Sequence, residues 1–219
     1  MKNGITELVF ILDASGSMSG MEADTIGGFN AMIEKQKQVE GKAFVSTVLF
    51  SNHSQVLHDR LPLEEINELT EKDYRVGGCT ALLDAIGGAI HHIGNIHKYV
   101  RKEDVPEKTI FIITTDGLEN ASFNYSTDEI KAKIKCQEEK YGWEFVFLAA
   151  NIDAVSTAEH IGIRRERAAN YDVEHGTRVM YSELSDIISE YREFGEIRET
   201  WAEKIEETTK DNATIGERK

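Results

Sequence analysis

The stretch that decides the fold is LVFILDASGS, residues 8–17. Its apolar run, residues 8–12, is typical of a strand that is buried on both faces of a parallel sheet. Asp13, Ser15 and Ser17 follow directly, and the small residues between them let the chain turn back so that the three polar side chains converge. Oxygen ligands of low total charge suit Mg²⁺, Ca²⁺ or Mn²⁺ rather than zinc or copper. The stretch therefore predicts a turn at the edge of a sheet that is able to hold a hard cation.

Asp, Ser and Gly are also ordinary turn and helix-cap residues, so this turn alone does not distinguish a metal site from a simple cap. Two further segments help to distinguish the two. Thr80 follows the segment Gly-Gly-Cys at residues 77–79 and precedes a helical pattern. Asp116 follows a second apolar strand, residues 110–115. Each segment adds one oxygen ligand at the end of an element, which favours a metal site over a simple cap. Glu119 and Asn120, shortly after Asp116, are candidates for lining the mouth of that site.

Together, the three segments resemble the metal-ion-dependent adhesion site (MIDAS) of von Willebrand factor type A (vWA) domains, whose pattern is Asp-x-Ser-x-Ser, then a lone Thr, then an Asp. The resemblance covers roughly residues 5–172 and is closest to the stand-alone cytoplasmic members from bacteria. It implies an intact MIDAS with five metal-site residues, Asp13, Ser15, Ser17, Thr80 and Asp116. It also implies that the three hydroxyls contact the metal directly, while the two carboxylates act mostly through water.

Strand and helix patterns alternate along the chain. We expect a strand at 8–12, a helix at 26–40, strands at 43–50 and 54–61, a helix at 82–93, a strand at 108–115, a helix at 126–141, a strand at 143–149, a helix at 154–161 and a strand at 168–171. This order predicts an α/β fold, an open, doubly wound, mostly parallel sheet of the Rossmann-like kind, with the strand at 54–61 as an antiparallel edge. Such folds place their sites at the carboxyl ends of the strands, where all three ligand segments lie.

The C-terminal part of the chain departs from this alternation. We divide the sequence into a vWA domain, residues 1–175, and a C-terminal helical extension, residues 176–219, made of an amphipathic helix and an acidic tail. The apolar stripe of one long helix, with Gly195 as a break point, is formed by Ile187, Tyr191, Phe194, Ile197, Trp201 and Ile205. The sequence leaves two interpretations open: a final helix that packs on the sheet, or a helix that pairs with another chain, including a second copy of this one.

Composition limits the classes of partner. The 219 residues are 40% hydrophobic with only 2 Pro, which argues against disorder, and the net charge of −14 disfavours nucleic acid and anionic membranes. The N-terminal apolar run is too short for a signal peptide or a membrane span, so we expect a cytoplasmic protein.

Cys79 and Cys136 lack CxxC spacing and are interpreted as free thiols. His91, His92 and His97 are interpreted as a solvated helix surface rather than as metal ligands.

These features predict a divalent-cation-dependent protein-binding module. Two carboxylates leave a divalent ion about neutral, so a Glu or Asp from a partner protein is a favourable last ligand. We expect Mg²⁺, with Mn²⁺ or Ca²⁺ as alternatives. A regulatory or assembly subunit for a bacterial ATPase or a tellurite-resistance-like stress-response complex is a second hypothesis. A metal-dependent hydrolase is disfavoured because no general base is evident, and we expect no enzymatic activity.

Overall fold

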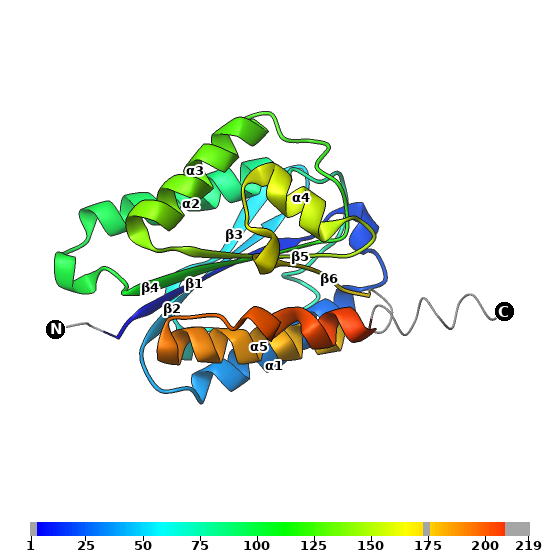
Figure 1. Cartoon of the computed structure of the whole chain (residues 1–219). Helices are drawn as coiled ribbons and strands as arrows, with labels where there is room; N and C mark the ends of the chain where they lie inside the picture. The colour runs from blue at the N-terminus through cyan, green and yellow to red at the C-terminus, as the bar shows by residue number, and fades with distance from the viewer. Residues whose placement is uncertain (1–3, 173–175, 209–219) are drawn as a thin grey trace.

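The computed structural model describes residues 4–172 and 176–208, in which a six-stranded sheet lies between two layers of helices (Figure 1). The strand order is β3-β2-β1-β4-β5-β6. The strands are β1 (Thr6–Asp13), β2 (Ala43–Phe50), β3 (Ser54–Pro62), β4 (Lys108–Thr115), β5 (Glu144–Ala149) and β6 (Ala168–Asn170). All neighbouring pairs are parallel except β2 and β3, which confirms the predicted fold class and its antiparallel edge.

The helices cover both faces of this sheet. One layer consists of α1 (Glu22–Lys37) and α5 (Thr177–Phe194), and the other of α2 (Leu82–Tyr99), α3 (Thr127–Tyr141) and α4 (Ala154–Ile161) (Figure 1). Leu8, Phe10 and Leu12 of β1 pack in the core on the α1 and α5 side, whereas Val9 and Ile11 pack in the core on the opposite side. Because successive side chains of a strand point to opposite faces, a strand buried on both faces needs the unbroken apolar run seen in the sequence.

The C-terminal stripe packs on the sheet, as in the first of the two interpretations. Ile187 and Tyr191 of α5 are buried in the core shared with β1, and α5 packs along α1. The helix breaks at the expected point: α5 ends at Phe194, where Gly195 adopts a left-handed conformation (φ 80°). The chain then turns back through η5 (Glu199–Ala202) and helical residues 203–208. Phe194, expected in the stripe, is 69% exposed.

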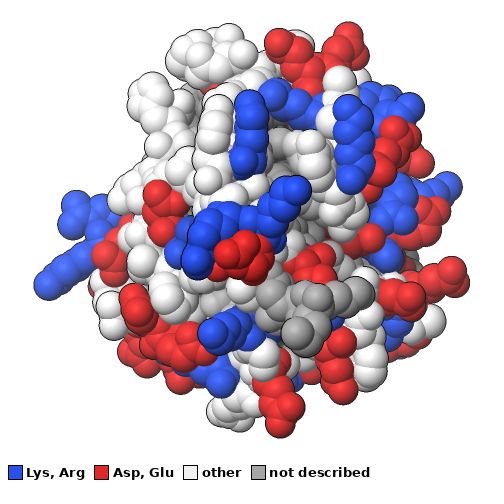
Figure 2. Space-filling view, turned by 90° about the vertical axis from the view of Figure 1, so that its left-hand side faces the viewer, with Lys and Arg blue, Asp and Glu red and all other residues white. Residues whose placement is uncertain are grey.

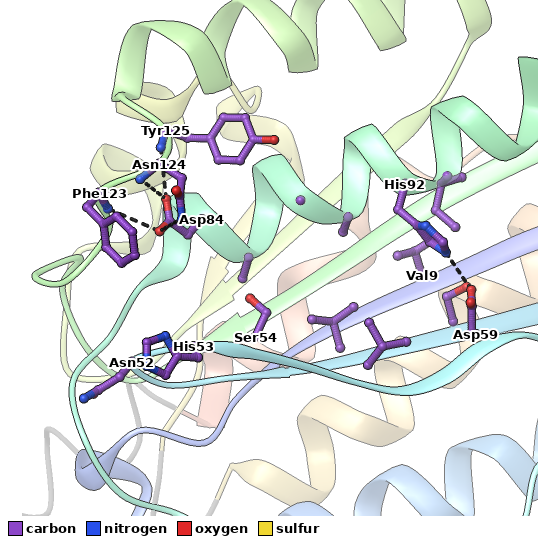
Figure 3. A pocket seen from close by; sticks show the side chains of 17 residues that line it. Val9, Asn52, His53, Ser54, Asp59, Asp84, His92, Phe123, Asn124 and Tyr125 are labelled. Atoms are coloured by element: carbon purple, nitrogen blue, oxygen red, sulfur yellow. Dashed lines mark hydrogen bonds and ion pairs between the residues drawn. The ribbon is translucent and has the colours of Figure 1, made fainter.

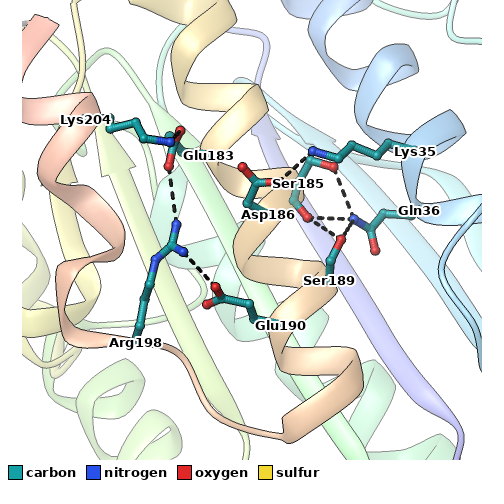
Figure 4. A network of polar contacts seen from close by, with 9 residues as sticks. All are labelled: Lys35, Gln36, Glu183, Ser185, Asp186, Ser189, Glu190, Arg198 and Lys204. Carbon is teal, nitrogen blue, oxygen red and sulfur yellow. Dashed lines mark hydrogen bonds and ion pairs between the residues drawn. The ribbon is translucent and has the colours of Figure 1, made fainter.

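Polar contacts fix the position of α5 (Figure 4). The buried amide of Gln36 on α1 donates hydrogen bonds to the backbone oxygen of Ser185 at 2.8 Å and to the hydroxyl of Ser189 at 2.9 Å. On the other side of α5, the carboxylate of Glu183 accepts a hydrogen bond from the ammonium of Lys204 at 2.8 Å. These contacts join α5 both to α1 and to the segment that follows it.

The antiparallel edge of the sheet is irregular. The pairing of β2 with β3 shifts register twice between Val45 and Val48, and Arg60 on β3 has a positive φ of 52°. The Arg60 guanidinium donates to the fully buried carboxylate of Glu7 at 2.7 Å, and His97 Nε2 lies 3.3 Å from the same oxygen. The prediction of a solvated His97 is therefore wrong, since its side chain is 11% exposed.

The face at the amino ends of the parallel strands carries charges of both signs. Figure 2 shows Lys and Arg side chains interspersed with Asp and Glu across this face, rather than gathered into one basic surface. Within residues 4–172 and 176–208, no helix is both long and apolar enough to cross a membrane.

Candidate metal centre

The three ligand segments meet at the opposite edge of the sheet, where the strand order reverses. The chain passes from β1 outward to β2 on one side, and β4 lies on the other side of β1 and continues to β5. Asp13 is the last residue of β1 and Asp116 follows the last residue of β4. Because these two strands are neighbours, their carboxyl ends bring both carboxylates to the crevice in which open α/β sheets bind ligands.

Asp13 is fully buried, and both of its carboxylate oxygens are hydrogen-bonded. Oδ1 accepts from the backbone N–H of Ser15 at 2.7 Å, and Oδ2 accepts from the hydroxyl of Thr115 at 2.5 Å. The hydroxyl of Tyr74 donates to the backbone oxygen of Asp13. Sequence reasoning missed Thr115 and Tyr74; the position of Thr115 at the end of β4 was an available signal, whereas Tyr74 lies in a loop without one. Asp13 thus holds the turn that carries the two serines.

A chain of oxygens leads from this turn to Asp116. The hydroxyls of Ser15 and Ser17 lie 3.0 Å apart, and the Ser17 hydroxyl donates to Asp116 Oδ1 at 2.6 Å. The second oxygen, Asp116 Oδ2, is buried and has no hydrogen-bond partner among the described residues. Burial raises the pKa of the Asp116 carboxyl, the hydrogen bond from Ser17 lowers it, and the negative charge of Asp13 raises it. The site therefore holds a buried carboxylate oxygen to which no group of residues 4–172 or 176–208 donates a hydrogen bond.

Thr80 reaches the same place from the loop before α2. Its backbone N–H donates to Oδ1 of Asn120 at 2.9 Å. The backbone N–H of Asn120 donates in turn to the backbone oxygen of Thr80 at 3.1 Å, so the Thr80 hydroxyl takes no part in this pair of bonds. A Cβ atom placed on Gly117 would lie 3.3 Å from Thr80 Oγ1 and 3.4 Å from Ser17 Oγ. The absent side chain of Gly117 thus leaves a small cradle, with two candidate hydroxyls on its wall. All five predicted site residues come from segments that converge here.

The glycines before Thr80 allow this approach. Gly78 has a φ of 83°, and a Cβ atom there would lie only 2.4 Å from Asn52 Oδ1. The backbone N–H of Gly16 donates to the Gly78 oxygen at 3.0 Å, which ties the loop to the serine turn. Asn52 Oδ1 also accepts from the backbone N–H of Cys79. Both Cys79 and Cys136 are free thiols in the described part of the chain.

The loop after Asp116 is held by two carboxylates, those of Asp84 and Glu119. Asp84, in the first turn of α2, accepts hydrogen bonds from the backbone N–H groups of Phe123, Asn124 and Tyr125 at 2.9–3.2 Å. Glu119 accepts from the backbone N–H of Leu83 at 2.8 Å and from two amides of its own loop. These bonds fix residues 117–125 against the start of α2, where negative charge is favoured by the helix dipole.

The donor set fits a hard divalent cation. No three His, Cys, Asp or Glu side chains of the described ranges gather in a group able to hold a metal ion. That observation leaves out hydroxyl groups, which belong to three of the five candidate side chains here and are acceptable ligands for Mg²⁺ or Ca²⁺. Asp116 Oδ2, for which the described chain offers no donor, and the cradle beside Gly117 are the features expected of such a site.

Comparison with known proteins identifies the family. The family of VWA domain containing CoxE-like proteins matches residues 2–141. The chain belongs to the VWA_CoxE family. The vWA domain is a protein-binding module that often carries a MIDAS metal site. A comparison with curated proteins gives no match.

Solved structures share the fold of this VWA_CoxE-family chain at low sequence identity. Proximal thread matrix protein 1 from the mussel byssus has a TM-score of 0.59 at 13% identity, over 85% of this chain and 46% of that chain. A von Willebrand factor type A structure from Catenulispora acidiphila has a TM-score of 0.56 at 12% identity, over 85% and 42%. The D319A mutant of the PilB minor pilin from Streptococcus sanguinis has a TM-score of 0.59 at 12% identity, over 90% and 62%. The chain thus spans about half the length of these proteins, and the likeness concerns the fold alone.

Proposed function

We propose that this chain is a divalent-cation-dependent protein-binding module, in which a cation, Mg²⁺ first of all, accepts a Glu or Asp side chain of a partner protein. The residues that would hold the cation are Asp13, Ser15, Ser17, Thr80 and Asp116. The observation that carries the proposal is Asp116 Oδ2, buried without a hydrogen-bond donor from the described chain, beside the cradle bordered by two hydroxyls. A structure of proximal thread matrix protein 1 with a zinc-occupied MIDAS motif, 14% identical and with a TM-score of 0.57, supports the proposal by analogy.

Charge explains why such a site would capture an acidic residue. A bound divalent ion would neutralise the two carboxylates and leave a coordination position for a third. The chain's own groups prepare the site: Thr115 and the Ser15 amide orient Asp13, and Asn120 holds Thr80. The five side chains offer only carboxylate and hydroxyl oxygens, so we propose binding rather than catalysis.

The direct test is the response of thermal stability to Mg²⁺. A ligand that binds only the folded state stabilises it by mass action, by about 2.7 kcal/mol at a hundred times the Kd. We expect the melting temperature to rise from EDTA to millimolar Mg²⁺ in the parent protein, with the rise abolished in Asp116→Asn. Asp128→Asn, an exposed carboxylate on α3, serves as the matched control and should respond like the parent. A parent protein that melts at the same temperature in both buffers, or an Asp116→Asn variant that still responds, would overturn the proposal.

A further inference from the structure

A groove with a volume of about 660 Å³ lies between β3 and α2 (Figure 3). It lies on the α2 side of the sheet, over residues of β2 and β3. Asn52, His53 and Phe123 stand at one end of the groove, and the pair formed by His92 and Asp59 stands at the other (Figure 3). The groove is thus open at the end near the metal centre.

The two carboxylates that line the groove are already paired. Asp84 accepts three backbone N–H groups of the loop 123–125, as described above. Asp59 Oδ1 lies 2.7 Å from His92 Nε2, and the hydroxyl of Ser46 accepts the backbone N–H of Arg60 at 3.1 Å. A charged ligand would therefore find few groups in the groove that are free to bind it.

What the groove offers a ligand is apolar surface. Val48, Ala89 and Ile93 lie at its base among the core residues, and two large apolar side chains at its border remain in solvent. Val56 is 53% exposed and Phe123 is 76% exposed. Because Asp84 fixes the backbone at Phe123, this ring is held out in solvent by a preformed loop, which lowers the entropy lost when a partner covers it.

One end of the groove lies next to the segment that carries Thr80. Asn52 lines the groove and accepts the N–H of Cys79, the residue before Thr80. The backbone oxygen of Ser51 accepts the N–H of Ala81, the residue after Thr80, at 2.9 Å. A chain segment bound at the metal centre would therefore pass the open end of the groove within a few residues.

We propose that the groove between β3 and α2 binds a bulky apolar side chain of the same partner segment that presents its carboxylate to the metal. The partner is accordingly a protein segment in which an acidic residue stands a few positions from a Leu, Ile, Met or Phe. This inference rests on the proposed function and adds the second recognition element. Burial of one side chain of that size corresponds to roughly tenfold or more in affinity.

Two glycines provide a matched pair of variants. Gly88 on α2 lines the groove, and a Cβ atom there would have no atom of the described chain within 4 Å, so Gly88→Leu introduces a side chain into the groove from an unobstructed position. Gly27 on α1 is equally unobstructed and lies on the other face of the sheet, which makes Gly27→Leu the control. Leu is the better helix former, so neither variant should melt below the parent.

The probe is a displayed peptide library with a fixed central Asp and randomised flanking positions, selected on the full-length protein in Mg²⁺ and eluted with EDTA. We expect the selected peptides to carry an apolar residue at a constant offset from the Asp. A selected peptide should bind Gly88→Leu about tenfold more weakly than the parent and Gly27→Leu as tightly as the parent. Mg²⁺ affinity, measured by calorimetry, should be equal in all three proteins.

Three results would overturn the inference while Mg²⁺ still binds to the parent: Mg²⁺-dependent peptides without an apolar preference, unchanged affinity of Gly88→Leu, or a library that yields no Mg²⁺-dependent peptide. A parent protein that does not bind Mg²⁺ in calorimetry would instead overturn the proposed function.

Discussion

Asp13 and Asp116 sit at the ends of neighbouring strands, yet their surroundings differ. Asp13 receives a hydrogen bond on each carboxylate oxygen, so its charge is compensated by the protein itself. Asp116 receives one from Ser17, while burial raises the pKa of its carboxyl. Folding raises the pKa of such a carboxyl. The carboxyl therefore destabilises the folded state when the pH is above the pKa that it has in the unfolded chain. Asp13 is therefore the structural member of the pair, whereas Asp116 keeps a buried oxygen for which the described chain offers no donor.

This difference predicts opposite effects on the metal-free protein. In EDTA at neutral pH, Asp13→Ala should lower the free energy of unfolding by about 1–3 kcal/mol, because the Ser15 amide and the Thr115 hydroxyl lose their acceptor. Asp116→Asn keeps an acceptor for Ser17 and removes the buried charge, so it should not lower that free energy. Urea unfolding measures both. Equal losses in the two variants would show that both carboxylates serve as structural acceptors only.

At the scale of the element, two adjacent glycines of α1 have different roles. A Cβ atom on Gly28 would lie 2.2 Å from the buried ring of Tyr181 on α5, whereas one on Gly27 meets no atom of the described residues within 4 Å. Gly28 thus lets α5 approach α1. Gly27→Ala should raise the free energy of unfolding by about 0.5–1 kcal/mol through helix propensity, and Gly28→Ala should lower it by about 1–3 kcal/mol through overpacking. Urea unfolding of the two variants provides the comparison, and effects of the same sign would contradict this account of the α1 and α5 contact.

The positions of the strands could be predicted from the sequence, whereas contacts between distant segments could not. The strand predictions 43–50 and 108–115 coincide with β2 and β4, since continuous apolar runs bounded by polar residues leave little freedom. The segments of the five candidate metal residues could be placed for the same reason, because Asp13 and Asp116 mark the ends of β1 and β4 and Thr80 lies shortly before α2. The burial of His97 could not be predicted, as it depends on Glu7 from a strand far away in sequence. Likewise, the bonds from Asp84 to the loop 123–125 arise only when the fold brings the two segments together.

The whole molecule depends on its last helix. The inner face of α5 is buried against the sheet through Met180, Tyr181, Leu184, Ile187, Ile188 and Tyr191. A chain that ends at residue 172 would expose the apolar face of the sheet that α5 covers. We expect this product to be insoluble or to lack near-ultraviolet circular dichroism while it binds a hydrophobic dye.

A chain that ends at residue 208 is the control for this truncation, and it should unfold cooperatively like the parent. Cooperative unfolding of the shorter product would show that residues 1–172 fold without α5, in agreement with a domain boundary near residue 175.

The irregular pairing of β3 has a consequence for how copies of this protein meet in concentrated solution. A straight edge strand exposes a row of unpaired backbone groups on which a neighbouring chain is able to extend the sheet. Here the register shifts, and the left-handed Arg60, anchored through its guanidinium to Glu7 inside the molecule, bend that row. The strand of a second molecule would therefore find no regular row of backbone groups to pair with along this part of the edge. Arg60 thus has two effects: it neutralises the buried carboxylate of Glu7, and it disfavours edge-to-edge association of two molecules through β3.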